Sequence, residues 1–278
     1  MSGQGMKRNA KKRKLALLGA ALGLLALASA AVAQAHPHGA IERKEGVQVT
    51  FNGQISPKSL PRQGTAPVSV IMTSKITSTI QGTPPPKLAR IQLKINANGK
   101  IQSKGLPTCS LGKLNTVSSQ TAKRSCAKAL IGHGNVTSRV SLPSQPPFAS
   151  VGGLLAFNGK YKGRPAVLAQ VESGPPLPLT YVIVFQVRKI HGTFGTELVG
   201  TLPPIASEYG YITAFNLSLG ATYSYHGKKM SYASAGCPAP KGLNAATFPF
   251  AEAGFQFDTE KHLEIAAEIE GECKVRGK

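Results

Sequence analysis

Clusters of lysine and arginine are the residues in this sequence best suited to chemistry, and that chemistry is attraction of anions rather than catalysis. They stand mostly where turns or a helix end are expected, and turns project charged side chains outward. A role in solubility alone is the alternative explanation. The candidate residues for contact with a polyanion are Lys123, Arg124, Lys160, Lys162, Arg164, Arg188, Lys189, Lys228 and Lys229.

The charge along the chain is uneven, which sharpens this prediction. The 278 residues carry 33 Lys and Arg against 12 Asp and Glu, a formal net charge of +21. No acidic residue occurs from Gly46 to Val171, whereas acidic residues concentrate near the C-terminus. A basic body of this kind attracts an anionic wall polymer or a membrane surface, and nucleic acid is not the partner we expect in vivo. Internal pairing of the acidic end with the basic body remains an alternative.

Two histidines offer a second chemistry, copper binding. If a leader is removed after Ala35, the mature chain starts His36-Pro37-His38, and a free N-terminal histidine can chelate copper through its amine and imidazole. Pro37 lacks the amide that a square-planar peptide site would use. The alternative is that these residues are an exposed leader, so we predict no metal site apart from this hypothesis on His36 and His38.

The sequence carries no recognisable catalytic motif. Nucleophile-elbow, zinc-protease, phosphate-loop and dinucleotide-binding patterns are all missing from it. A glycosidase would need two carboxylates across a cleft. The acidic residues are expected instead at solvated strand ends or on the wet face of a terminal strand, so we predict no catalytic residue and no cofactor. Those considered are Glu172, Glu197 and Glu208 in mid-chain, and Glu264, Glu268 and Glu270 near the end.

The first 35 residues have the order of a Sec-type signal peptide. Met1 to Lys14 is basic, Leu15 to Ala33 is an uninterrupted apolar run, and Ala-x-Ala pairs follow at Ala31 and Ala33. Cleavage after Ala33 or Ala35 would export the chain to the cell envelope or the medium. The alternative is a retained anchor, because an apolar run of this length can just span a bilayer.

Four cysteines lie beyond this segment, at positions 109, 126, 237 and 273. An even number in an exported chain indicates two disulfides. Three pairings are possible, and we favour Cys109 with Cys126 and Cys237 with Cys273, since each closes a loop within its own half. No Cys-x-x-Cys pair or histidine at ligand spacing supports zinc.

Hydrophobic periodicity predicts mainly strands. Leu88 to Ile95 and His262 to Ile269 alternate apolar and polar residues, which is typical of half-buried strands, and Thr180 to Ile190 is apolar enough for a central strand. Asn98-Gly99 favours a tight turn with Ile101 beginning the return strand. Further strands are expected at Val47 to Phe51, Ala66 to Thr73, Val136 to Leu142, Val151 to Phe157, Pro165 to Val171, Thr213 to Tyr225 and Met230 to Ala235.

One helix is expected, capped by Ser118 or Ser119 and ended by Gly132, with Cys126 on its inner face. Many short strands with Gly and Pro turns favour a mainly β fold, an antiparallel β-sandwich-like architecture with this one disulfide-anchored helix. We predict a flexible leader at 36–45 and a single β-rich domain at 46–278, with two β domains at 46–146 and 147–278 as the alternative.

Several short motifs are spread over residues 45–275. They are Leu60-Pro61-Arg62, Gly105-Leu106-Pro107-x-Cys109, the segment from Cys126 to Gly132, Phe157-Asn158-Gly159 and Cys237-Pro238. With the N-terminal segment, they resemble exported proteins encoded in actinobacterial genomes. The resemblance implies export, disulfides and a single architecture, and it implies no active site. The sequence thus predicts an exported, non-catalytic envelope-associated protein that binds polyanions or has a structural role, with a copper-binding secreted protein or oxygenase as the alternative.

Overall fold

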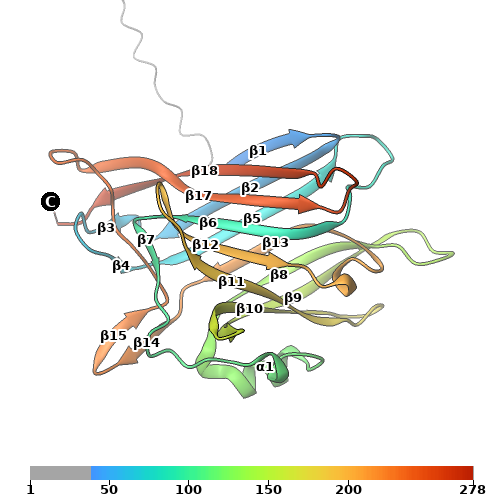
Figure 1. The fold of residues 1–278 in the computed structure, drawn as a ribbon, viewed down its shortest axis with the longest axis horizontal. Helices are drawn as coiled ribbons and strands as arrows, with labels where there is room; N and C mark the ends of the chain where they lie inside the picture. The colour runs from blue at the N-terminus through green and yellow to red at the C-terminus, as the bar shows by residue number, and fades with distance from the viewer. Residues whose placement is uncertain (1–38, 278) are drawn as a thin grey trace, which may run out of the picture. The chain divides into compact units, whose positions relative to one another are not determined.

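The computed structural model of this chain describes residues 39–277, most of which form antiparallel strands (Figure 1). Thirteen strands join in one sheet in the order β1-β2-β5-β13-β8-β9-β10-β11-β12-β6-β17-β18-β3, and only β3 pairs in parallel. These strands are β1 (Gly39–Lys44), β2 (Val47–Ser56), β3 (Ser59–Leu60), β5 (Ser69–Ser78), β6 (Leu88–Asn96), β8 (Leu130–Val140), β9 (Phe148–Tyr161), β10 (Arg164–Ser173), β11 (Thr180–Lys189), β12 (Phe194–Thr201), β13 (Gly210–Leu219), β17 (Ala245–Phe257) and β18 (Glu264–Val275). Strands from 46–146 and strands from 147–278 are intermixed in this sheet, so the two ranges do not form separate sheets.

Smaller elements complete the fold. A three-stranded sheet has the order β4-β16-β7, and β14 pairs with β15 in a hairpin. Their bounds are β4 (Ala66–Pro67), β7 (Gly99–Ile101), β14 (Thr222–Tyr225), β15 (Lys228–Ser231) and β16 (Ala233–Ala235). The helices are α1 (Ser119–Cys126) and the short 3-10 turns η1 (Leu111–Lys113), η2 (Ala127–Ala129) and η3 (Pro204–Ala206). The predicted mainly β, antiparallel class with one short disulfide-anchored helix is confirmed.

The large sheet rolls up around a common apolar core. Its late strand β18 comes to lie against β1 and β2, and Nζ of Lys44 donates a 3.3 Å hydrogen bond to the carbonyl oxygen of Glu264. Alternation along each strand turns one face inward. The outward residues of β18 are exposed, among them Glu264, Glu268 and Glu270, as predicted for a terminal strand with a wet face.

A second apolar cluster covers the outer face of β9 and β10. Leu114, Ala122 and Cys126 pack there against Phe157 and Leu168, so these two strands are buried on both faces. The disulfide between Cys109 and Cys126 closes this layer. The backbone at Cys109 runs beside β9, and its N–H donates a 2.8 Å hydrogen bond to the carbonyl oxygen of Asn158.

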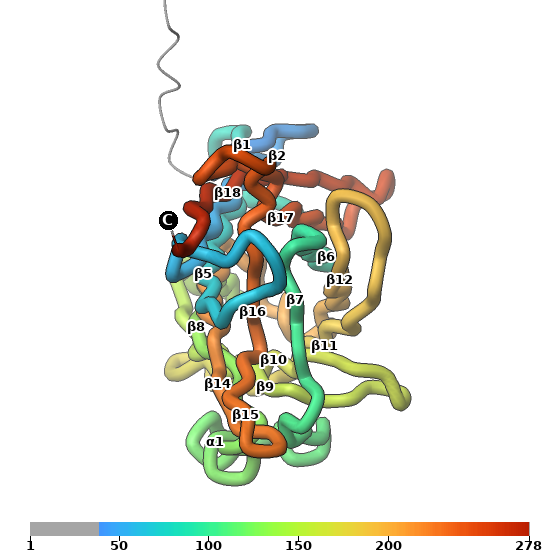
Figure 2. Tube along the Cα trace, turned by 90° about the vertical axis from the view of Figure 1, so that its left-hand side faces the viewer, coloured from blue at the N-terminus to red at the C-terminus, as the bar shows by residue number. Residues whose placement is uncertain are grey.

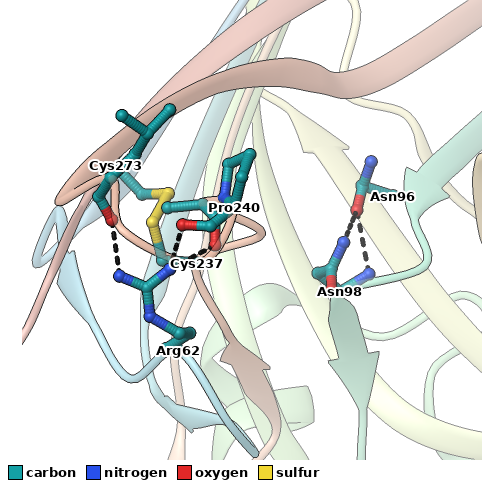
Figure 3. Close-up of a disulfide and its surroundings, with 8 residues drawn as sticks. Arg62, Asn96, Asn98, Cys237, Pro240 and Cys273 are labelled. Carbon is teal, nitrogen blue, oxygen red and sulfur yellow. Dashed lines mark hydrogen bonds between the residues drawn. A yellow bond between two sulfur atoms is a disulfide. The ribbon is translucent and has the colours of Figure 1, made fainter.

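The other predicted disulfide, between Cys237 and Cys273, is also present and joins the segment after β16 to β18. Arg62 lies beside it (Figure 3). Its guanidinium donates hydrogen bonds to the carbonyl oxygens of Ala239, at 2.6 Å, and of Pro240 and Leu243. The disulfide and Arg62 together fix the strap between β16 and β17 onto the end of the roll.

Some sequence predictions are wrong in detail. Gly39–Lys44 form strand β1 on the edge of β2 and are not a flexible leader, because the open edge of β2 supplies backbone hydrogen-bond partners there. The helix ends at Cys126, and Leu130 to Gly132 belong to β8, which pairs with β9. Tertiary pairing therefore overrides the helical spacing of these residues.

Two strand connections also differ. Asn98 forms the expected turn, with its N–H and Nδ2 donating to Oδ1 of Asn96 (Figure 3), but β7 pairs with β16 rather than with β6. Both edges of β6 are already occupied by β12 and β17. The stretch from Thr213 to Tyr225 divides at Gly220 into β13 and β14, which join different sheets.

Candidate functional site

A basic recess opens at one end of the roll, where the small sheet and the β14–β15 hairpin lie across the strand ends. Figure 2 views this end and shows β7, β14, β15 and β16 toward the viewer. The recess has a volume of about 790 Å³ and lies between these elements and the ends of β10, β11 and β12. It is defined here by its polar lining, which comprises Lys100, Arg188, Lys189, Lys229, Thr65, Thr196, Ser103, Ser231, Ser234, Gln102, Asn158 and Tyr232.

The charge around the recess has one sign. Lys100, Lys189 and Lys229 are exposed at its rim, and their ammonium groups form no salt bridge within residues 39–277. Arg188 adds a fourth cation, and no Asp or Glu lines the hollow. Cations that converge on a concave surface add their fields, so the recess attracts an anion more strongly than scattered lysines would.

The deeper part of the recess is firmly built. Tyr232 is 1% exposed, and burial raises the pKa of its phenol well above the ordinary value, so the hydroxyl stays protonated as a possible donor. Nδ2 of the buried Asn158 donates to the carbonyl oxygens of Leu106, at 3.3 Å, and Pro107, at 2.9 Å. Ser231 donates to the carbonyl of Ala233 at 2.7 Å. These bonds hold the floor of the recess in place beneath the exposed lysines.

The structure brings together part of the predicted set of basic residues. Arg188 and Lys189 end β11, and Lys229 approaches from β15, although these segments are far apart in the sequence. Lys228 is exposed beside Lys229 but does not line the recess. Lys100, at the centre of β7, was missed by the sequence analysis because it stands alone rather than in a cluster.

The remaining predicted residues lie elsewhere. Lys160, Lys162 and Arg164 are exposed around the β9–β10 turn, with Nζ of Lys162 5.5 Å from the centre of the Tyr161 ring. This turn borders the recess, because Pro165 belongs to its lining. Lys123 and Arg124 are in the last turn of α1, on the layer that covers β9 and β10, and do not line the recess.

A second hollow, the polar groove, crosses the outer face of β11, β12, β6, β17 and β18, with a volume of about 560 Å³. Gly254 on β17 is one of the residues that line it. A Cβ added there would lie 3.3 Å from Oε1 of Gln92 and 3.6 Å from Oε1 of Glu264. Polar side chains that line the groove include Arg90, Gln92, Gln186, Arg188, Glu197, Gln256 and Glu264.

The groove differs from the recess in its charge, which is mixed. Nε2 of Gln92 donates to Glu197, and Nη1 of Arg188 lies 4.0 Å from Oε2 of the same carboxylate. Beside the groove, a 2.6 Å hydrogen bond to Glu252 raises the pKa of Lys94; nearby carboxylates add to this effect and burial opposes it. Anions are therefore favoured by the recess and not by the groove.

The mid-chain carboxylates only partly occupy the surroundings expected of them. Glu172 accepts a 2.6 Å hydrogen bond from the backbone N–H of Ser119 at the start of α1, and Glu197 has a side chain only 12% exposed. Glu172 lies next to the end of β10, as expected, although its carboxylate has a backbone partner, whereas the prediction of a solvated strand end is wrong for Glu197, which lies within β12. Glu208 is exposed, as expected.

The residues of the copper hypothesis and of the predicted signal peptide lie outside the described residues. His36 and His38, with the whole of residues 1–35, precede the first described residue. From Gly39 to Gly277, no three His, Cys, Asp or Glu side chains gather as metal ligands would. No helix within that range is long and apolar enough to cross a membrane.

Comparisons with protein-family models, with curated proteins and with solved structures gave no match. The resemblance to actinobacterial exported proteins therefore stays a prediction. The class of protein defined by the structure is a disulfide-linked, rolled antiparallel β protein with a basic recess at one end.

Proposed function

We propose that this protein is an exported, non-catalytic binding protein that holds an anionic ligand of the cell envelope in the basic recess. The observation that carries the proposal is the convergence of Lys100, Arg188, Lys189 and Lys229 on one hollow without a lining carboxylate. Three separate parts of the chain supply these cations, so their convergence depends on the fold and is not a feature of one basic stretch.

The recess has the chemistry of a site for phosphate or carboxylate groups. Lysine ammonium groups act as mobile point charges, and the hydroxyl groups of Thr196 and Ser103 and the phenol of Tyr232 can donate hydrogen bonds to anionic oxygens. Lysine and arginine at the rim also speed the approach of an anionic ligand. Added salt weakens both the attraction by these charges and the faster approach of the ligand, because exposed charges are screened.

Two features support a location outside the cytoplasm. Both disulfides are formed, and disulfides persist in oxidising compartments. The order of basic, apolar and Ala-x-Ala residues in the first 35 positions supports Sec-type export. An anionic wall polymer and the anionic membrane surface are the envelope components whose charge fits the recess.

Fluorescence anisotropy with labelled inorganic polyphosphate tests the proposal on the full chain with its disulfides intact. The recess variant Lys189→Glu with Lys229→Glu should weaken binding by about tenfold or more at low salt. The matched control is Lys123→Glu with Arg124→Glu on α1, which changes net charge equally and should lose much less.

Equal loss in the two double variants would overturn the proposal, because binding would then follow net charge and not the recess. Absence of any salt-dependent binding by the unmodified chain would overturn it too. Circular dichroism of each variant verifies that the fold is intact, and Lys100→Gln provides a milder second recess variant.

A further inference from the structure

The interior of the roll is hollow near the basic recess. A cavity of about 100 Å³ is lined by apolar side chains from nine strands, with Thr73 and Ser74 as its polar members. Four phenylalanine rings stand among the mostly aliphatic lining residues: Phe51, Phe185, Phe215 and Phe255. An apolar space of this kind is not stabilised by bound water, because water finds few polar partners in it.

Several of these inward side chains are incompletely covered. Phe185, Phe215 and Leu217 are half-buried although they face the inside of the roll. Other side chains of the same lining are fully covered, among them Ile183 and Phe255, which are 1% and 2% exposed. Protein interiors are otherwise packed at the density of organic crystals, and apolar surface left uncovered inside a fold gains free energy when an apolar ligand covers it.

The cavity and the recess are neighbours along the inner faces of three adjacent strands. On β11 the inward residues run from Ile183 and Phe185 in the cavity to Val187 and Lys189 in the recess. On β10 they run from Val167 to Pro165, and on β12 from Leu198 to Thr196. Each step is two residues, which spans about 7 Å along a strand. The charged recess therefore lies about two residues further along the same strand faces than the apolar cavity.

Phe185, in the cavity lining, lies closely against a glycine of the next strand. Phe185 pairs across the strands with Gly200 on β12, and a Cβ at Gly200 would lie 2.6 Å from the Phe185 ring. A larger residue at position 200 would push the ring toward the cavity. Glycine leaves room for the ring beside β12 instead.

We infer that the ligand is an anionic amphiphile, with its charged group in the basic recess and the start of a single alkyl or acyl chain in the apolar cavity. This inference rests on the proposed function, because it assigns the head group to the same recess. The recess is lined by four cationic side chains, whereas the cavity lining has no charged residue and is almost wholly apolar, so the two sites match the two ends of such a molecule. The cavity is smaller than the ~150 Å³ that holds benzene, so it takes a short chain until half-buried side chains such as Leu217 move.

Calorimetric titration of the full chain with inorganic phosphate and with butyl, hexyl and octyl phosphate tests the inference below micelle concentrations. Affinity should rise by about fourfold for each methylene that becomes buried and then level off once the cavity is filled. Octanol, which has the chain without the charge, should bind far more weakly than octyl phosphate. The recess variant Lys189→Glu with Lys229→Glu should weaken binding of every phosphate in the series.

Two cavity variants should change the dependence of affinity on chain length in opposite directions. Ala253→Leu fills the cavity and should remove the gain with chain length while leaving phosphate binding unchanged. Leu217→Ala enlarges it and should move the plateau to longer chains. Leu217 is half-buried, so this second variant should fold even where the first does not.

The outcomes separate the inference from the proposed function. Phosphate binding in the recess with no dependence on chain length would overturn the inference and leave the proposed function standing. Failure to bind any anion would overturn both. Equal affinity for octanol and octyl phosphate would overturn the inference as well, since the recess would then contribute nothing to binding of the amphiphile.

Discussion

Arg188 and Glu197 meet at the border between the basic recess and the polar groove, with Nη1 and Oε2 4.0 Å apart. The arginine side chain is 53% exposed and the glutamate side chain 12%. Arg188 lines both hollows, whereas Glu197 lines the groove alone. The carboxylate therefore draws the guanidinium toward the groove and offsets part of the positive field at the recess.

Glu197→Gln should strengthen anion binding. The substitution keeps an acceptor for Gln92 and removes the negative charge beside Arg188. A partly exposed pair at 4.0 Å is worth up to about 1 kcal/mol, so the affinity for phosphate should rise by about two- to fivefold. Titration calorimetry at low salt measures the change. Glu268→Gln on the outer face of β18 is the control with equal net charge, and an equal gain there would contradict a local effect.

The two disulfides should differ in their contribution to stability. Cys237–Cys273 closes a span of 36 residues and Cys109–Cys126 one of 17. Loop-closure entropy gives about 4 kcal/mol for the longer loop and about 3 kcal/mol for the shorter. Urea unfolding of the two paired Cys→Ala variants should show the larger loss for Cys237 and Cys273. A larger loss for the 109–126 pair would show that contacts of α1, rather than loop length, decide the order.

Local patterns predicted the strands well because alternation depends on nearby residues. Leu88 to Ile95 forms a strand as expected, and both disulfide pairings were anticipated from loop closure. The order of strands could not be predicted, because it depends on which edges are free. β6 is therefore followed in the sequence by β7 but lies between β12 and β17 in the sheet.

The candidate site was only partly visible in the sequence. Arg188, Lys189 and Lys229 stood out as members of basic clusters, but nothing local related β11 to β15. Lys100 is isolated in sequence and gained its place only when β7 joined the small sheet. The apolar cavity left no trace in the sequence, since Phe185 and Phe215 have the same periodicity as fully packed residues.

Gln170→Ala should destabilise the layer that carries α1. Gln170 is fully buried on β10, and its Nε2 donates to the carbonyl oxygens of Leu114 and Val117, at 2.9 and 2.8 Å. Removing the amide leaves both carbonyls without a donor and opens a small cavity, which together cost about 2–4 kcal/mol. Urea unfolding measures the loss, and proteolysis should become faster between Ser110 and Thr121. Gln54→Ala on the exposed face of β2 is the control and should be nearly neutral.

Stability should fall in alkali through Tyr181, whose ring is 8% exposed inside the roll. Burial raises the pKa of its phenol from 10.0 to about 12. The unfolded chain therefore loses this proton at a lower pH than the folded chain does. The contribution of Tyr181 to the free energy of unfolding is constant below about pH 10. It then declines by about 1.4 kcal/mol per pH unit up to about pH 12. Tyr181→Phe should remove about 2–3 kcal/mol of this decline in urea unfolding followed against pH. Tyr209→Phe, on an exposed ring, is the control, and its free energy of unfolding should follow that of the unmodified chain at every pH. If the Tyr181→Phe variant also followed the unmodified chain, the phenol of Tyr181 would be excluded as the source of alkaline unfolding.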